Sequence, residues 1–509
     1  MAGRVDDASP SQLATETRAL LRDATRVYWG TPHAGRVAEI LLRLDAPLRV
    51  ALVGRMKAGK STLLNALVGE RLARTDTGEC TKVVTWYHDG PTYRVTLHPR
   101  TGPPESLRFA RTSTSLEFEL GHATVADVDR VEVEWPSAEL RSMTLIDTPG
   151  IARTTSEGGD AFGRLVEGSS EAETADAVIY LLRHIGRADE RFLAELTNDD
   201  FVRPNPMNTV GVLSRADELS AGDPAAMRHA EAVAERYNAQ PLVRGLCNSV
   251  VPVNGLLAEA GETMTETEFR HLRAISHLPA DELADLLMAV DRFIHWPTSL
   301  SIPSETRRLL IDRLGVFGVR AATAHLRAHR SMVTADQLAD HLVDASGLRR
   351  VRDLLQVRFS QRRALLKARS ALVSLGHLIE RFPVAGTPSL ERRLDQVRAG
   401  AHELAELRVL EAISTGQLKL RPEQTDEAMR LLSGAATAMG PRLGLPAASE
   451  APALRAAALA ALVRWRESAE SPLSSRAVAE ACRVITRTCE GMLASLGTPD
   501  AAVGDSSGP

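Results

Sequence analysis

Short apolar runs alternate with helical patterns through the middle of the chain. Each run is four to six residues long, and its side chains suit a strand that is buried on both faces. The runs are 48–53, 83–87, 131–135, 143–146, 177–182, 210–213 and 250–253. Alternation of such strands with helices is typical of a mostly parallel, doubly wound sheet. We therefore expect an α/β domain over residues 48–300.

Both ends of the chain carry helical patterns instead. Apolar residues recur at steps of three and four over 11–45, and again from about residue 348 to residue 495. A turn over 382–388 interrupts the second region, and its glycine and two prolines should reverse the chain. These regions predict an all-α helical bundle beside the α/β domain.

The composition excludes several classes of protein. The 61 basic and 65 acidic residues leave a net charge of −4, so the chain as a whole is not a polybasic nucleic-acid binder. Four cysteines without Cys-x-x-Cys spacing indicate neither a disulfide framework nor a structural metal site. Because no secretory leader and no run of about 18 apolar residues is visible, we expect a cytoplasmic protein without a membrane span.

A glycine-rich segment follows the first strand and precedes a helix. In this position it matches a phosphate-binding P-loop, and the flanking elements disfavour a chance match. Backbone N–H groups should surround a β-phosphate, Lys60 should bridge phosphates, and the Ser61 hydroxyl should bind Mg²⁺. The expected nucleotide contacts are Gly54, Arg55, Met56, Lys57, Ala58, Gly59, Lys60, Ser61 and Thr62.

A second motif, Asp147-Thr148-Pro149-Gly150, ends the run 143–146. Asp147 can hold Mg²⁺ through water, and the Gly150 N–H can sense a γ-phosphate. The tetrapeptide alone could be a plain turn, but behind a P-loop it favours a GTPase over most ATPases. Ile151 stands where small GTPases carry the glutamine that positions water, so the water must be oriented otherwise.

The polar stretch 75–82 lies between these two motifs. A threonine there should close over Mg²⁺ and the γ-phosphate as switch I. We favour Thr81 for this role, with Thr75 and Thr77 as rivals.

Ser214-Arg215-Ala216-Asp217 ends another strand and loosely matches the guanine-reading Asn/Thr-Lys-x-Asp pattern. Asp217 would accept hydrogen bonds from the N1 and N2 hydrogens of guanine, which adenine cannot offer. Arginine replaces lysine here, and the stem of Arg215 can still stack on a base. An ordinary loop at a strand end is the alternative. Val253 and Asn254, after the last strand, occupy the place of a base-backing loop.

The order of these motifs, between short N-terminal helices and a long helical half, resembles the bacterial dynamin-like GTPases. The likeness is greatest to the mycobacterial isoniazid-inducible dynamin-like proteins, in particular to their shorter member. It implies an α/β P-loop GTPase domain with an all-α neck and trunk. The implied layout is neck helices 1–47, a GTPase domain 48–300, a hinge segment 301–330 near Gly315 and Gly318, a trunk and neck bundle 331–497, and a disordered tail 498–509.

The resemblance also implies an activity. The chain would hydrolyse GTP to GDP with Mg²⁺ and would couple G-domain dimerisation to fission or fusion at the inner face of the cell membrane. Its partners would be a second copy, a sister dynamin-like protein and anionic lipids, with no nucleic acid. A soluble regulatory GTPase with a helical protein-binding arm is the first alternative, and a ribosome- or RNA-associated GTPase is the second.

Lys57 departs from many dynamins, which carry serine at this P-loop position. Related membrane-fusing GTPases carry an arginine that acts as a finger on the phosphates in cis. A cation here can neutralise charge between the β- and γ-phosphates, in place of a bound monovalent ion. Lys57 is therefore either an internal finger or a solvent-facing side chain. The expected catalytic residues are Lys57, Lys60, Ser61, Thr81 and Gly150.

Two segments are candidates for membrane contact. The first is the turn near 381–393, whose residues Arg381, Phe382, Val384, Arg392 and Arg393 combine apolar and basic side chains. A simple turn between helices explains this segment nearly as well. The second is the arginine-rich stretch 349–369, which could lie against anionic lipid, although pairing within the protein is the favoured interpretation.

Overall fold

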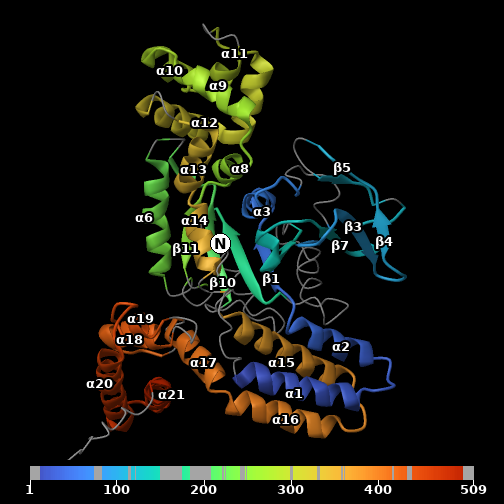
Figure 1. The fold of residues 1–509 in the computed structure, drawn as a ribbon, viewed down its shortest axis with the longest axis vertical. Helices are drawn as coiled ribbons and strands as arrows, with labels where there is room; N and C mark the ends of the chain where they lie inside the picture. The colour runs from blue at the N-terminus through green and yellow to red at the C-terminus, as the bar shows by residue number, and fades with distance from the viewer. Residues whose placement is uncertain are drawn as a thin grey trace, which may run out of the picture. The chain divides into compact units, whose positions relative to one another are not determined.

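The computed structural model divides the chain into two compact units. One is the α/β unit, Tyr28–Val384, and the other is the helical unit, which combines Met1–Val27 with Ala385–Pro509. Figure 1 shows the elements of both. The structure describes residues 12–73, 83–112, 116–120, 122–149, 175–183, 208–220, 223, 225–240, 243, 247, 249–297, 302–329, 333–356, 359, 362–414, 418–432 and 438–496.

A nine-stranded sheet forms the centre of the α/β unit, in the order β11-β10-β9-β1-β8-β2-β7-β3-β4. Its first five strands are parallel, and β2 joins them antiparallel to β8. The strands are β1 (Leu48–Gly54), β2 (Thr85–His88), β3 (Arg94–Pro99), β4 (Glu105–Leu107), β7 (Val128–Glu134), β8 (Met143–Asp147), β9 (Ala177–Leu182), β10 (Thr209–Ser214) and β11 (Val250–Val253). The predicted mostly parallel α/β fold is confirmed, and each apolar run became a strand.

Strand β1 shows why the sheet is covered on both faces. Val50 and Leu52 point to one face, where they share a core with α3 (Lys60–Val68) and α14 (Leu348–Leu355). Ala51 and Val53 point to the other face, toward the core that contains α6 (Ala226–Asn238). Side chains alternate along a strand, so a continuous apolar run is required wherever both faces carry helices.

Helices that follow the sheet in sequence pack back onto it. Helix α13 (Ala335–Ser346) packs against α8 (Gly255–Glu262), and α14 packs against α3, β10 and β11. Gly347, between α13 and α14, has φ of 82°, and an added Cβ atom would lie 2.4 Å from the carbonyl oxygen of Pro252. Residues 335–355, expected in the trunk, therefore belong to the α/β unit.

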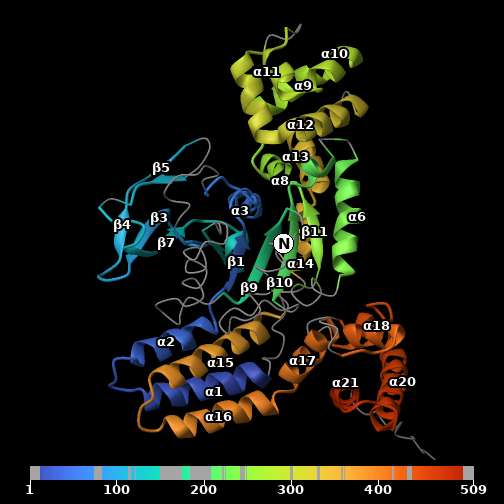
Figure 2. The ribbon, with the colours of Figure 1, turned by 180° about the vertical axis from the view of Figure 1, so that it is seen from behind.

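A helical layer caps one end of this unit, at the top of Figures 1 and 2. It contains α9 (Glu266–Ser276), α10 (Ala280–Leu286), α11 (Val290–His295) and α12 (Ser304–Ala328), which enclose a second apolar core. Thr265 and Glu268 form a capping box that fixes the start of α9. At the other end of the unit, α2 (Ala34–Arg43) packs on α15 (Arg363–Arg381).

The helical unit joins the two ends of the chain. Helix α1 (Gln12–Val27) packs on α16 (Thr387–Gly400), and α20 (Ala451–Glu470) packs along α21 (Arg476–Ser495). The other helices are α17 (His402–Ser414), α18 (Pro422–Leu431) and α19 (Met439–Arg442). Across the described part of both units, every helix is too short or too polar to cross a bilayer.

Candidate nucleotide-binding site

The nucleotide motifs come together at one edge of the sheet. Gly54, Asp147, Ser214 and Val253 are the last residues of β1, β8, β10 and β11, which run parallel within the same half of the sheet. The carboxyl ends of parallel strands therefore place all four motifs along one edge, where open α/β sheets bind ligands.

The P-loop connects β1 to α3. Gly54 must be glycine, because a Cβ atom there would lie 2.6 Å from the carbonyl oxygen of Leu181. Gly59 has φ of 90° and precedes Lys60, the first residue of α3. The buried Lys60 ammonium donates to the carbonyl oxygens of Gly54 at 3.2 Å and Arg55 at 3.4 Å. Burial lowers the pKa of Lys60, and Asp147 partly opposes this shift.

The side chains of Ser61 and Asp147 are in contact, as expected for two residues that bind the same metal ion. The Ser61 hydroxyl donates to Asp147 Oδ2 at 3.0 Å. The other carboxylate oxygen, Oδ1, is buried and has no hydrogen-bond partner among the described residues. Burial raises the pKa of Asp147, while Lys60 and the Ser61 hydrogen bond oppose that shift. A hydroxyl beside a carboxylate with a spare oxygen fits the oxygen-rich ligation that Mg²⁺ prefers.

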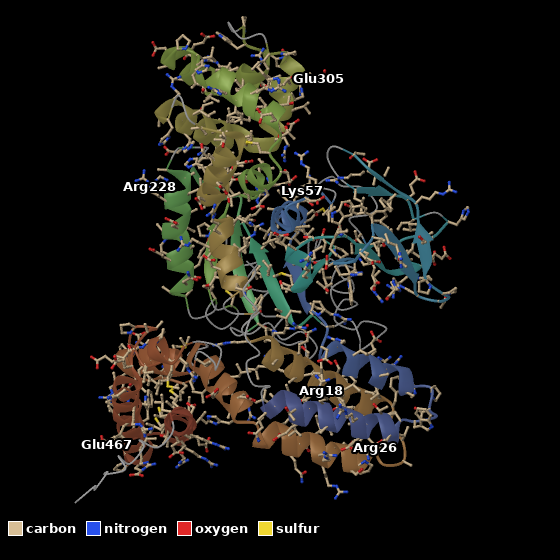
Figure 3. The ribbon with its side chains drawn as sticks, viewed as in Figure 1. Arg18, Arg26, Lys57, Arg228, Glu305 and Glu467 are labelled. Atoms are coloured by element: carbon tan, nitrogen blue, oxygen red, sulfur yellow. The ribbon has the colours of Figure 1, made fainter. Side chains whose placement is uncertain are left out.

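Neighbouring contacts hold these two motifs in register. The Thr148 hydroxyl donates to the carbonyl oxygen of Leu52 at 2.7 Å, which ties the end of β8 to β1. Lys57 lies before α3 (Figure 3), has φ of 61° and exposes its side chain. Met56 beside it is 54% exposed. The two P-loop residues therefore face outward, where a phosphate or a partner can reach them.

The expected base-reading loop begins at Ser214. Its hydroxyl donates to the carbonyl oxygen of Leu182 at 3.1 Å, so the serine ties β10 to β9. Arg215 has φ of 53°, and its guanidinium lies 2.6 Å from Glu218 Oε1. Asp217 follows in a short 3₁₀ helix, Ala216–Ser220, and burial raises the pKa of its carboxyl group.

Two residues that sequence reasoning missed hold this loop. The guanidinium of Arg183, just after β9, lies 2.5 Å from Glu218 Oε2, so Glu218 bridges Arg183 and Arg215. An acidic residue three positions after Arg215 was the available signal. Exposed pairs of this kind add little stability, but they orient the arginine.

Asn254 caps α8 at the end of β11. Its Oδ1 accepts from the Leu257 N–H at 3.1 Å, while its Nδ2 is buried and has no hydrogen-bond partner among the described residues. A Cβ atom on Gly255 would lie 3.4 Å from Thr62 Cγ2, so this turn sits against the P-loop helix. Thr81 and Gly150, together with Thr75, Thr77 and Ile151, lie outside the described residues.

The residues considered for membrane contact belong to both units, with Arg381, Phe382 and Val384 in the α/β unit and Arg392 and Arg393 in the helical unit. The Phe382 ring stacks on His33 at 4.0 Å between centroids, with the Arg36 and Arg381 guanidinium carbons 4.7 and 5.6 Å from its centroid. The side chain of Val384 is partly buried. In the helical unit, Arg393 pairs with Asp23, and Arg392 donates to the carbonyl oxygen of Pro388.

Several cations of the stretch 349–369 are paired within the α/β unit. Arg349 contacts Asp344, Arg350 contacts Glu231, Arg352 contacts Glu262 and Lys367 contacts Asp176. The pairing interpretation is therefore supported for these residues.

Comparison with known proteins identifies the group. Residues 50–216 match the Dynamin family. The isoniazid-induced protein IniC of Mycobacterium tuberculosis is 36% identical over 484 residues, covering 94% of this chain and 97% of IniC. This chain belongs to the dynamin family. The dynamin family consists of GTPases, which bind GTP and hydrolyse it to GDP.

Two other relatives match a shorter part of this dynamin-like protein. A bacterial dynamin-like protein of Nostoc punctiforme is 37% identical over 118 residues, covering 21% of this chain and 17% of that protein. The isoniazid-induced protein IniA of M. tuberculosis is 36% identical over 112 residues, covering 21% and 18%. A solved chain of an oligomerised bacterial dynamin pair covers 97% of this chain and 76% of its own, with 14% identity and a TM-score of 0.29.

Proposed function

We propose that this dynamin-like protein is a Mg²⁺-dependent GTPase that remodels the inner face of the cell membrane through nucleotide-dependent pairing of its G domains. The contact between Ser61 and Asp147 carries the catalytic part of the proposal, because it sets a hydroxyl beside a spare carboxylate oxygen next to the P-loop. Asp217, near the carboxyl end of β10 on the same sheet, supports guanine as the base.

Hydrolysis would proceed by in-line attack of water on the γ-phosphate. Lys60, Lys57 and the P-loop N–H groups would stabilise negative charge on the phosphates. Ser61 and Asp147 would hold Mg²⁺, which neutralises charge on the β- and γ-phosphates when bound. Thr81 and Gly150 would position the water. Asp217 would accept from the guanine N1 and N2 hydrogens, with Arg215 along the face of the base and the loop at Val253 and Asn254 behind it.

The membrane part of the proposal rests on family membership and on one surface. Trp29 is 80% exposed in the same turn region that contains His33, the stacking partner of Phe382. An exposed indole suits the headgroup layer of a bilayer. A second copy or a sister dynamin-like protein would supply the paired G domain.

The test is turnover of GTP and ATP by the full chain, with and without vesicles of phosphatidylglycerol. We expect GTP to be hydrolysed in preference to ATP and the anionic vesicles to raise the rate. Preference for ATP would remove the role of Asp217. Failure to bind vesicles in every nucleotide state would remove membrane remodelling and leave a soluble regulatory GTPase with a helical arm.

A further inference from the structure

Helix α12 is interrupted at a single residue. Gly315 has φ of 64° and ψ of 172° inside an element that otherwise runs from Ser304 to Ala328. This part of backbone space is open to glycine and essentially closed to residues with a Cβ atom. The backbone therefore requires glycine here, and α12 consists of two halves, 304–314 and 316–328.

Hydrogen bonds connect each half of α12 to neighbouring helices. Before the kink, Arg313 donates to Glu268 Oε1 at 2.9 Å and to the Thr263 hydroxyl at 2.8 Å. After the kink, Arg320 donates to the carbonyl oxygen of Leu287 at 2.9 Å. Since each half is anchored separately, the kink has a defined direction.

The kink in α12 lies next to Asp217, the residue that is expected to read guanine. A Cβ atom built on Gly315 would lie 4.0 Å from Asp217 Oδ2 and 3.9 Å from Leu256 Cδ1. Asp217 comes from the loop after β10, Leu256 from the first turn of α8, and Gly315 from a helix about a hundred residues farther along the chain. Three elements of the α/β unit thus meet at Gly315.

A second glycine allows α12 to come this close. A Cβ atom on Gly318 would lie 3.1 Å from Leu257 Cδ1 and 3.0 Å from Leu314 Cβ. A Cβ atom at position 318 would therefore be tighter than ordinary van der Waals contact with α8, the helix that starts at the expected base-backing loop. Gly318 thus lets α12 lie close to α8, and Gly315 lies next to the Asp217 side chain.

The position of α12 affects the surroundings of the Asp217 carboxylate. The Gly315 backbone lies beside the Asp217 carboxylate, and burial of that carboxyl group raises its pKa. A partly buried carboxylate forms stronger hydrogen bonds with the donors that reach it than a carboxylate in bulk water does. The direction of the Asp217 side chain then depends on the position of α12 as well as on its own loop.

We propose that Gly315 is a specificity-determining residue that positions Asp217 for guanine through the kink in α12. This rests on the proposed role of Asp217. It extends base selection to a helix outside residues 50–216, the segment that matches the Dynamin family.

The experiment measures equilibrium binding of GDP and ADP to the full chain carrying Gly315→Ala. We expect GDP affinity to fall about tenfold while ADP affinity changes less than about twofold, because only guanine has donors for Asp217. Equal weakening of both nucleotides would show that the kink supports the whole site and would overturn the proposal. So would unchanged affinity for GDP.

Gly102→Ala is the matched control. Gly102 has φ of 110°, and a Cβ atom there would lie 3.9 Å from Pro99 Cγ. The control therefore introduces backbone strain in equally open space, in the region that joins β3 and β4. We expect it to leave the ratio of GDP to ADP affinity unchanged. A ratio that falls as much as in Gly315→Ala would assign the loss to strain in general.

Two further variants separate the possible failures. Leu256→Ala removes the α8 side chain next to the kink without changing the backbone. We expect it to lower GDP selectivity about threefold, which keeps the test open if Gly315→Ala does not fold. Asp217→Asn tests the proposed function itself. If Asp217→Asn lowers the selectivity while Gly315→Ala and Leu256→Ala retain it, the proposal for Gly315 is wrong and the role of Asp217 stands. If Asp217→Asn also retains it, the base-reading role of Asp217 is wrong, and Gly315 loses its role with it.

Discussion

Lys57 and Arg215 are the non-glycine residues with positive φ in the described part of the chain, at 61° and 53°. A residue with a Cβ atom in the left-handed region costs roughly 1–2 kcal/mol relative to the right-handed one. One of these cations lies in the P-loop and the other in the loop that is expected to read the base. Because backbone strain is concentrated at functional sites, we expect the direction of each side chain to matter for nucleotide binding.

Lys57→Gly should separate the strain from the function. Glycine accepts the left-handed backbone, so we expect the variant to melt at a higher temperature, by an amount that corresponds to about 1 kcal/mol. If Lys57 is a finger, turnover of GTP in sodium should fall roughly 100-fold, and potassium should restore part of it. Thermal melting and phosphate release report the two effects on the same sample.

Lys57→Ser provides the comparison for that experiment. It should lose turnover in sodium as the glycine variant does, without the gain in melting temperature. Wild-type turnover in either variant without potassium would mean that Lys57 faces solvent and takes no part in the chemistry.

The individual residues of the site differ in how far sequence could place them. The P-loop is contiguous, and its strand and helix fix its shape, so Lys60 and Ser61 lie where the motif predicts. The partner of Arg215 lies outside the motif and is shared with another segment, because Glu218 also pairs with Arg183, which follows a different strand. Contacts between distant segments depend on sheet order, which no single motif encodes.

At the level of elements, the end of the α/β unit that carries α2 and α15 is held by one buried carboxylate. Asp176, at the start of β9, accepts from the Arg49 N–H at 2.9 Å, and the Lys367 ammonium of α15 lies 2.7 Å from its Oδ2. Burial alone would raise the pKa of Asp176, but Lys367 and Arg43 hold it below its usual range. This carboxylate therefore ties β1 and β9 to both helices.

Lys367→Met should destabilise the α/β unit strongly. Both side chains are buried, and removal of the ammonium leaves the Asp176 carboxylate with the longer 3.9 Å contact to Arg43, so the loss should approach the value of about 3–5 kcal/mol that is typical of a broken buried pair. The double variant Asp176→Asn with Lys367→Met should recover part of the loss. Chemical denaturation of the single and double variants measures the difference. Equal loss in both would show that the pair itself adds nothing beyond packing.

A cluster of three histidines should make the stability of the part of the α/β unit that contains α12 and α13 depend on pH. The His325 ring of α12 stacks on His341 of α13 at 3.9 Å and lies 4.6 Å from His329. Burial, with added repulsion from neighbouring histidines, lowers the pKa of His325 and His341, although Asp344 opposes the shift of His341, so the folded state favours neutral rings. Their stabilising contribution is therefore complete above about pH 6.5 and is lost as the pH falls through the lower folded values.

Melting temperatures between pH 5 and pH 8 should show this loss on the acid side. His341→Gln should flatten the profile, since glutamine fills similar space without taking up a proton. His122→Gln, in the region between β6 (Leu116–Phe118) and β7, is a control and should keep the wild-type slope. The same slope in His341→Gln would place the acid sensitivity elsewhere.

The elements that sequence patterns missed share one property. Strands β3 and β4 and the hairpin of β5 (Phe109–Arg111) with β6 are short or half-exposed, so they lack the long apolar runs of the central strands. The break between α14 and α15 was also missed, because apolar residues continue at helical spacing across it. Periodicity reports burial well, but it does not report where a chain turns.

For the molecule as a whole, the two connections between the units leave the α/β unit side by side. They follow Val27 and Val384, and the Tyr28 hydroxyl donates to the carbonyl oxygen of Phe382 at 3.0 Å. The resemblance to dynamin-like proteins implied a helical part built from both chain ends, which periodicity alone does not reveal. The helical unit combines both ends of the chain.

Trp29 lies at this paired connection and provides the sharpest test of membrane contact. Because its side chain is 80% exposed, Trp29→Ser should leave the melting temperature unchanged. If the surface enters the headgroup layer, sedimentation with phosphatidylglycerol vesicles should fall several-fold, since an indole is a strong interfacial anchor. Tyr93→Ser, which removes a 56% exposed aromatic ring next to β3, should sediment like the wild type. Equal sedimentation of both variants with the wild type would exclude Trp29 as an anchor and move the search for the lipid contact to the helical unit.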